Sequence, residues 1–320
     1  MKSIWIAAIA LAVAGSALAQ GSYPTRPVIM VVGFAPGGGT DAVARIVAKN
    51  LSESLGQQVL VENKAGAGGN IATDYVARAA PDGHTILLGS VGSLAVAPHV
   101  IANLPYDPLR DFAPITMAVV FANVLVVQPT LPVQSLADYV KLAKDRPGSV
   151  TYGSSGILGA GHLAGELLKI RANIDMIHVP YKGGGPAMQD MLGGQVMSIF
   201  ATPVSAGGQI KAGKVRAVVT TGPKRAALLP EVPTVAESGY PGYEAMNWYA
   251  YLAPAKTPKE IIDRLNRELV KALNNAEVVA LLHQQGLEPS PSSAAELARY
   301  MEREYETWGK VVKQAGIKAQ

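Results

Sequence analysis

Apolar and polar positions along the first half of the chain follow a repeating order of strand, glycine-rich loop and helix. The apolar run 28–32 predicts a buried strand, and the loop 34–39, Phe-Ala-Pro-Gly-Gly-Gly, comes directly after it. Apolar residues then recur at helical spacing over 43–55, and Thr40 or Asp41 can cap that helix. This order is typical of a parallel α/β sheet.

The same order continues and divides the chain into two units. Strands at 58–61 and 85–88 continue the first unit. The second unit is predicted from the following segments: strands 124–127, 150–153, 176–179, 196–200 and 216–220, and helices 135–146, 160–170 and 186–192. From 257 on the chain is predicted to be nearly all helix. This part begins Thr-Pro-Lys-Glu, which is typical of a helix start: a capping threonine, a proline at the first helical position and a glutamate three residues after the cap.

Three of the glycine-rich loops lead directly into the N-terminus of a predicted helix, at 37–40, 156–162 and 183–186. Such loops expose unpaired backbone N–H groups at the positive end of a helix dipole, which together form an anion site without a charged side chain. Glycine is also expected wherever a strand turns tightly into a helix. Each loop taken alone therefore leaves both interpretations open.

Composition narrows the class of protein. The chain has 320 residues, of which 49% are hydrophobic, and this length is typical of about two domains with cores of their own. The absence of cysteine excludes disulfides, thiolate metal sites and a cysteine nucleophile. A formal net charge of +4 without a long basic run does not indicate a nucleic-acid-binding protein.

The N-terminus has the pattern of a secretory signal peptide. Lys2 precedes the apolar stretch 4–14, and Ala17-Leu18-Ala19 provides the small residues of a cleavage site. We therefore expect residues 1–19 to be removed after Ala19 and the mature protein to be exported. The alternative is an uncleaved membrane anchor, for which the apolar stretch is short.

Sequence signatures of catalysis are missing. The chain has no phosphate-binding loop and no dinucleotide fingerprint, and Ser155 lacks the final glycine of a nucleophile elbow. The five histidines show no metal-binding spacing. We therefore predict no enzyme, no cofactor and no metal. His162 can face a pocket or serve the structure, Lys182 can meet an anion or lie in solvent, and Tyr249 can line a cleft or belong to an aromatic cluster.

Short motifs occur in a fixed order along the whole mature chain. They are Tyr-Pro-Thr-Arg-Pro at 23–27, the loop 34–41, Pro-Asp-Gly at 81–83, Tyr-Asp-Pro at 106–108, Asp-Phe-Ala-Pro at 111–114, Tyr-Gly-Ser at 152–154, His-Leu-Ala-Gly-Glu at 162–166, Val-Pro-Tyr-Lys-Gly at 179–183, Leu-Pro-Glu-Val-Pro-Thr at 229–234 and Glu-Ser-Gly at 237–239. In this order they resemble the Bug family of periplasmic solute-binding proteins, the receptor components of tripartite tricarboxylate transporters.

This resemblance implies a type II periplasmic-binding-protein fold, in which two α/β lobes are joined by a two-segment hinge and enclose the ligand cleft. The crossings are expected near 121–124 and 247–251. Lobe 1 would then comprise 20–122 and 249–320, and lobe 2 would comprise 123–248. The protein would be a periplasmic monomer that captures a small carboxylate and delivers it to membrane permease subunits. Alternatively, it would present the bound carboxylate to a two-component sensor kinase.

The resemblance also implies the residues of the site. The ligand carboxylate would be held by the loop after the first strand and by a matching loop of the other lobe. The first loop would contribute Phe34, Ala35, Gly38, Gly39, Thr40 and Asp41. The matching loop would contribute Ser154, Ser155, Gly156, Ile157, Leu158, Gly159 and His162. The surrounding walls would be formed by Ser90, Ser93, Tyr181, Lys182, Gly183, Ala201, Thr202 and Tyr249.

Two departures from the family pattern bear on the ligand. The second loop reads Gly-Ile-Leu-Gly at 156–159, where relatives often have Gly-x-Gly-Ser, and Ala201 stands where many relatives carry a polar or acidic residue. Both changes make the expected site more apolar. They predict a mono- or dicarboxylate with an apolar or aromatic body, rather than citrate or a zwitterionic amino acid.

Overall fold

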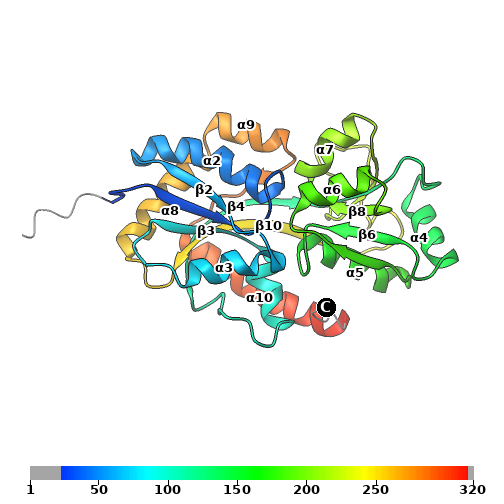
Figure 1. Cartoon of the computed structure of the whole chain (residues 1–320), viewed down its shortest axis with the longest axis horizontal. Coiled ribbons are helices and arrows are strands. Elements are labelled where there is room, and N and C mark those ends of the chain that lie inside the picture. The colour runs from blue at the N-terminus through cyan, green and yellow to red at the C-terminus, as the bar shows by residue number, and fades with distance from the viewer. Residues whose placement is uncertain (1–22, 316–320) are drawn as a thin grey trace, which may run out of the picture.

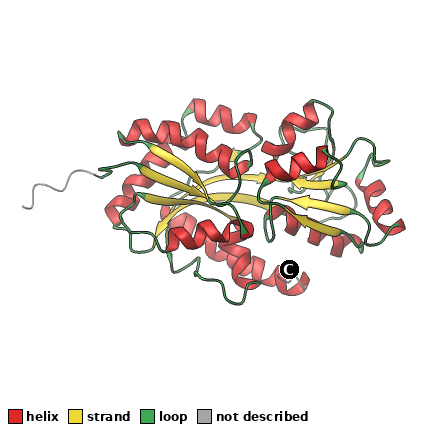
Figure 2. Cartoon of the chain, in the orientation of Figure 1, coloured by secondary structure: helices red, strands yellow, loops and turns green. Residues whose placement is uncertain are grey.

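The computed structural model describes residues 23–315, so the predicted signal peptide 1–19 and its cleavage after Ala19 lie outside the described part of the chain. Residues 23–315 form two α/β lobes that lie side by side, each built on its own sheet (Figure 1, Figure 2). Within these residues, none of the helices combines the length and the apolar character that a membrane crossing needs.

The first lobe is built on a six-stranded mixed sheet with the order β11-β4-β10-β3-β1-β2. Strands β1, β2 and β3 are parallel, whereas β10 runs antiparallel to both β3 and β4. Strand β1 reads Val-Ile-Met-Val-Val without polar alternation because helices cover both faces of the sheet. The strands are β1 (Val28–Val32), β2 (Val59–Asn63), β3 (Thr85–Ser90), β4 (Phe112–Ala122), β10 (Met246–Pro254) and β11 (Glu288–Pro289).

Helices cover the two faces of this sheet with separate cores. One core contains residues of α2 (Gly39–Leu55), α8 (Lys259–Leu273) and α9 (Ala276–Gln284). The other contains residues of α3 (Asn70–Ala77) and of the C-terminal α10 (Ala294–Ala315). Short helical turns connect these elements: η2 (Ala67–Gly69), η3 (Gly92–Val96) and η4 (Ala97–His99).

The second lobe is built on a five-stranded sheet with the order β7-β6-β8-β5-β9, in which β5 runs antiparallel to both its neighbours. Helices α4 and α5 contribute to the core on one face, and α6 and α7 to the core on the other. The strands are β5 (Val124–Val127), β6 (Thr151–Ser154), β7 (Ile177–Pro180), β8 (Ser198–Ala201) and β9 (Arg216–Thr220). The helices are α4 (Leu136–Asp145), α5 (Ala160–Ala172), α6 (Gly184–Leu192) and α7 (Pro203–Lys211).

The chain crosses between the lobes twice. It leaves the first sheet after β4, passes Asn123 and enters β5, and it returns at the start of β10. Thr221 ties the two crossings together: its hydroxyl accepts from the N–H of Asn123 at 2.9 Å and donates to the carbonyl of Ala245 at 2.8 Å. Because β10 begins at Met246, the predicted lobe boundary at residue 249 falls inside a strand of the first sheet.

The two lobes touch each other around the cleft through backbone atoms. The N–H of Ala35 donates to the carbonyl of Lys182 at 2.8 Å, which joins the first loop of lobe 1 directly to lobe 2. A Cβ placed on Gly68 would lie 2.2 Å from the carbonyl oxygen of Ile157 across the cleft. Only glycine allows this approach, so the described arrangement is a closed one.

Candidate functional site

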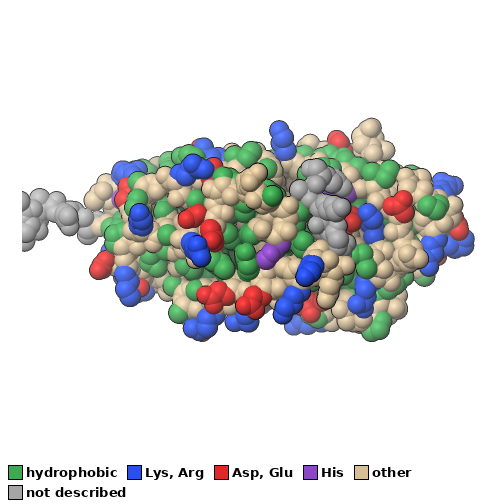
Figure 3. Space-filling view, turned by 90° about the horizontal axis from the view of Figure 1, so that it is seen from below, with side chains coloured by type: hydrophobic (Ala, Val, Ile, Leu, Met, Phe, Trp, Pro, Cys, Tyr) green, Lys and Arg blue, Asp and Glu red, His purple; other side chains and the backbone are tan. Residues whose placement is uncertain are grey.

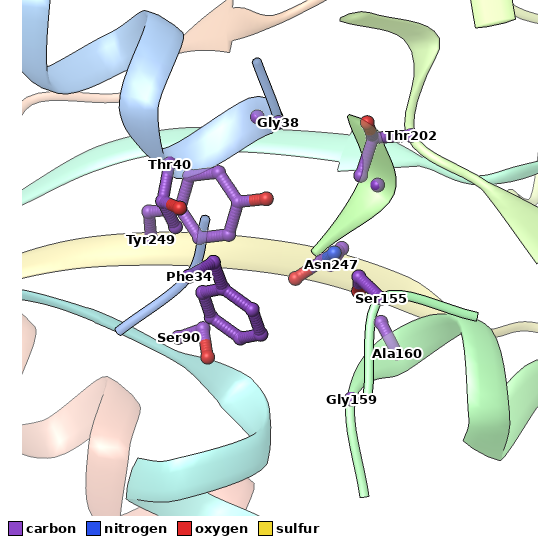
Figure 4. A pocket seen from close by; sticks show the side chains of 12 residues that line it. Phe34, Gly38, Thr40, Ser90, Ser155, Gly159, Ala160, Thr202, Asn247 and Tyr249 are labelled. Atoms are coloured by element: carbon purple, nitrogen blue, oxygen red, sulfur yellow. The ribbon is translucent and has the colours of Figure 1, made fainter. Parts of the chain in front are cut away.

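A pocket lies between the two lobes, at the ends of their glycine-rich loops (Figure 4). In this closed arrangement the space that a water-sized sphere can occupy is about 10 Å³, close to the room that one water needs. Among residues 23–315, no Lys, Arg, Asp or Glu lines it. Lobe 1 contributes Phe34, Gly38, Gly39, Thr40, Ser90, Asn247 and Tyr249, and lobe 2 contributes Ser155, Gly159, Ala160, Gly184 and Thr202.

Four helices direct their N-termini at this pocket, one from lobe 1 and three from lobe 2. In each case a lining residue is the N-cap or the first residue of the helix: Gly38 and Gly39 for α2, Gly159 and Ala160 for α5, Gly184 for α6, and Thr202 for α7. Helix N-termini present free N–H groups and partial positive charge. The pocket is therefore electropositive through its backbone, while basic and acidic side chains are interspersed on the outer face in Figure 3.

Asp41 holds the first loop in shape and does not line the pocket. Its carboxylate accepts hydrogen bonds from the N–H of Gly37 at 3.1 Å, from Asn63 Nδ2 at 3.0 Å and from Arg45 Nε at 3.0 Å. Asn63 Nδ2 also donates to the carbonyl of Phe34 at 2.9 Å. Burial raises the pKa of Asp41, but these hydrogen bonds outweigh it and lower the pKa overall. The expected ligand contact of Asp41 is thus replaced by support of the loop.

The second loop is supported by two buried histidines. The rings of His162 and His178 stack with centroids 4.1 Å apart. His162 Nδ1 accepts the N–H of Leu158 at 3.1 Å, and His178 Nε2 lies 2.7 Å from Ser154 Oγ. Burial lowers the pKa of His162 to about 4 and that of His178 to about 3, so both are neutral at pH 7. His162 therefore supports the loop through its hydrogen bond with Leu158 and does not line the pocket.

The structure brings nine of the predicted site residues into the pocket and places the others around it. Those that line it are Phe34, Gly38, Gly39, Thr40, Ser90, Ser155, Gly159, Thr202 and Tyr249. Those that do not are Ala35, Asp41, Ser93, Ser154, Gly156, Ile157, Leu158, His162, Tyr181, Lys182, Gly183 and Ala201. Gly156, Ile157, Tyr181 and Lys182 line a neighbouring hollow between the lobes together with the loop 66–68.

The side chains at the two departures from the family pattern, from which we predicted an apolar site, do not line the pocket. Leu158 is 2% exposed and packs into a core of lobe 1 residues, and Ala201 is 3% exposed and packs into the core of lobe 2. Ile157 lies in the neighbouring hollow. The apolar surface that the pocket does contain comes from Phe34, from Ala160 and from the ring of Tyr249.

Sequence reasoning missed three lining residues: Ala160, Gly184 and Asn247. The first two are the residues that begin α5 and α6, next to loops that were predicted. Asn247 had a signal of its own, because it is a polar residue beside the apolar run Trp-Tyr-Ala-Tyr-Leu-Ala at 248–253. It is 5% exposed, which is unusual for an amide side chain without a structural partner.

Among residues 23–315 there is no group of three or more His, Asp or Glu side chains that could hold a metal ion. The pocket also lacks a charged pair that could act as acid and base. Its chemistry is that of backbone N–H groups, hydroxyls, one amide and two aromatic rings. Such a set has the donors to bind and orient a small anion.

Comparison with known proteins agrees with this geometry. Residues 43–317 match the family described as "Tripartite tricarboxylate transporter family receptor". Protein BugT of Bordetella pertussis is 38% identical over 313 residues, which cover 97% of this chain and 96% of BugT.

Solved structures extend the comparison to the fold. The structure of the periplasmic binding protein BugD matches with a TM-score of 0.90 at 37% identity, over 93% of this chain and 100% of BugD. Rpa4515 of R. palustris, solved with adipate, matches with a TM-score of 0.89 at 38% identity, over 93% and 99% of the two chains. MatC of Rhodopseudomonas palustris, solved with malate, matches with a TM-score of 0.87 at 32% identity, over 91% and 100%.

These matches confirm the two-lobed periplasmic-binding-protein fold that the motifs predicted. They span nearly the whole described chain, and BugD is a periplasmic binding protein. The chain therefore belongs to the tripartite tricarboxylate transporter receptor family, the Bug family of periplasmic solute-binding receptors, and is not an enzyme.

Proposed function

We propose that this protein captures a small carboxylate in the periplasm and delivers it to the membrane permease subunits of a tripartite tricarboxylate-type transporter. The observation that carries the proposal is the convergence of four helix N-termini on a pocket without a charged side chain. A carboxylate is the small anion whose oxygens suit such N–H groups. Two of the matching structures contain carboxylates, adipate and malate.

Capture would depend on closure of the two lobes. The N-terminus of α2 belongs to lobe 1, whereas those of α5, α6 and α7 belong to lobe 2. An anion that contacts both sets is bound best when the lobes are closed, and it shifts the population toward that state. The closed state would then be the form that the permease recognises.

The body of the ligand would lie against the rings of Phe34 and Tyr249. Phe34 is 8% exposed, and both rings line the pocket beside the N-terminus of α2. A mono- or dicarboxylate with an apolar or aromatic body fits this wall. This support comes from Phe34 and Tyr249, since Leu158 and Ala201 point into cores.

A thermal-shift screen over carboxylic acids tests the proposal. The protein would first be unfolded and refolded to remove any bound solute, which the absence of cysteine simplifies. A ligand at 100 times its Kd is expected to add about 2.7 kcal/mol to the free energy of unfolding. The amide of each acid is the matched control, because it lacks the negative charge. If no acid stabilises the protein more than its amide does, the anion site is refuted.

Delivery is tested separately in cells. Deletion of the gene for this receptor is expected to abolish uptake of the radiolabelled acid that the screen selects, and the wild-type gene should restore it. A variant with a bulky side chain at Gly39 should fail to restore uptake, because a Cβ there would already lie 2.6 Å from the Tyr249 hydroxyl oxygen. Undiminished uptake in the deletion strain would refute a role in transport.

A further inference from the structure

The loop between β6 and α5 of lobe 2 contacts both the pocket and the interior of lobe 1. Ser155 and Gly159 line the pocket. Ile157 and Leu158, which lie between them, pack against a core made mostly of lobe 1 residues. Leu158 is only 2% exposed, although it belongs to a loop at the edge of a cleft. One segment of lobe 2 is thus seated in lobe 1.

Two turns of lobe 1 receive this segment. A Cβ placed on Gly68 in η2 would lie 2.2 Å from the carbonyl oxygen of Ile157. A Cβ placed on Gly92 in η3 would lie 2.9 Å from the carbonyl oxygen of Leu158. The turns η2 and η3 are themselves in contact. The two glycines therefore leave a slot in lobe 1, and residues 157–158 fill it.

Leu158 adopts a backbone conformation that leucine normally avoids. Its φ is +62°, and among residues 23–315 only two other non-glycine residues, Ala67 and Asn173, lie in this left-handed region. On the lobe 2 side, His162 Nδ1 accepts the N–H of Leu158 at 3.1 Å and holds the conformation. Strain of this kind persists where surrounding contacts compensate for it, and here the surrounding core is made mostly of lobe 1 residues.

The contacts of residues 157–158 with lobe 1 belong to the closed arrangement. Opening the cleft would draw this segment out of its slot and expose the Leu158 side chain to water. The cost of that exposure does not depend on a ligand. Because Ser155 and Gly159 of the same loop line the pocket, withdrawal from the slot would also remove part of the pocket wall.

We propose that Leu158 is a latch: its insertion into lobe 1 stabilises the closed state of the ligand-free protein and thereby sets the affinity for every solute that the receptor takes. The observed affinity of a protein that closes on its ligand includes the free energy of closing. A residue that stabilises the closed state therefore strengthens binding without touching the ligand. The latch acts on the closed state itself, so it does not depend on which solute occupies the pocket.

Small-angle X-ray scattering on ligand-free protein tests the latch directly. The protein is first unfolded and refolded to remove bound solute. Leu158→Gly should have a larger radius of gyration than the wild type, because glycine leaves the slot unfilled and is unstrained at a φ of +62°. An unchanged radius of gyration in ligand-free Leu158→Gly overturns the proposal.

Two further variants separate a latch from a leucine that only contributes to stability. Leu158→Met keeps most of the apolar volume and should keep the smaller radius of gyration. Leu168→Ala is the matched control, because Leu168 is fully buried in a core made of lobe 2 residues. It should lower the urea midpoint and leave the radius of gyration unchanged. If Leu168→Ala expands the ligand-free protein as much as Leu158→Gly does, the expansion is a general loosening and the latch is refuted.

Calorimetric titration with adipate and with malate gives a second readout. Leu158→Gly should weaken the binding of each acid by one common factor of about 10- to 150-fold, the equivalent of burying a leucine side chain. The factor is common because Leu158 does not line the pocket. A loss confined to one acid would show that Leu158 contacts the ligand and would overturn the latch. If no carboxylate binds, the proposed function fails, whereas the scattering of ligand-free protein still decides the latch.

Discussion

The closed arrangement makes a quantitative prediction about Gly68. This glycine lies on lobe 1 in η2, and the carbonyl of Ile157 approaches it from lobe 2. In Gly68→Ala the new Cβ would lie 2.2 Å from that oxygen, where an ordinary contact is 3.4–4 Å. The two loops must therefore move apart by about 1 Å before the lobes can close fully.

The cost of this clash can be separated from the cost of backbone strain. Gly68 has φ +66°, and alanine in that conformation costs about 1–2 kcal/mol whether the lobes are open or closed. The contact with Ile157 exists only when they are closed. Overpacking of this kind costs about 1–3 kcal/mol, which corresponds to a loss of about 5- to 150-fold in ligand affinity.

Gly56 provides a matched control. It also lies in lobe 1, with φ +68°, but a Cβ there would have no atom within 4 Å. Gly56→Ala should therefore lose about as much stability as Gly68→Ala and bind the ligand normally. Calorimetric titration with the tightest acid of the screen, together with urea unfolding of ligand-free protein, measures both quantities. Equal affinities of the two variants would refute the reasoning that this contact forms in the binding-competent state.

Three further predictions concern residues that support the site from outside. Glu304→Ala should lower the free energy of unfolding by about 1–3 kcal/mol in urea titrations, because Glu304 Oε2 accepts the indole N–H of fully buried Trp248 at 2.8 Å; an unchanged midpoint would contradict this. Acidification below pH 6.5 should destabilise the protein, because burial lowers the folded pKa of His162 to about 4 and that of His178 to about 3, so that above these values only the unfolded chain binds the protons; a double glutamine variant that loses stability equally on acidification would contradict it. Asp41→Asn should weaken carboxylate binding measured by calorimetry, because it weakens the hydrogen bonds that hold the first loop; unchanged affinity would contradict a supporting role for Asp41.

The repeating order of the sequence predicted most elements because buried strands and amphipathic helices have different periods. It did not predict β4 and β10 as strands, although these long strands carry the chain into and out of the lobe crossings. Both are almost continuously apolar, and β4 contains Pro114, so neither shows the alternation that distinguishes a half-buried strand.

The candidate site was predictable where its chemistry lies in the backbone. Glycine-rich loops before helices at 37–40, 156–162 and 183–186 are visible in the sequence, and each contributes a helix N-terminus to the pocket. The side chains were less predictable. Leu158 lies in the same loop as Ser155 and Gly159, yet at a φ of +62° its side chain packs into a core. Local order along the chain does not determine that direction.

The sequence by itself determined two α/β units, the glycine loops and the absence of thiol chemistry, because these follow from periodicity, local backbone freedom and composition. Only the tertiary structure decided which side chains meet in the cleft. Asn247 and Thr40 are far apart in the chain, and they line one pocket because β10 returns from lobe 2 to pair with β3, beside β1 and α2. The pairing of distant strands brings these two residues together, and no local pattern of the sequence encodes that pairing.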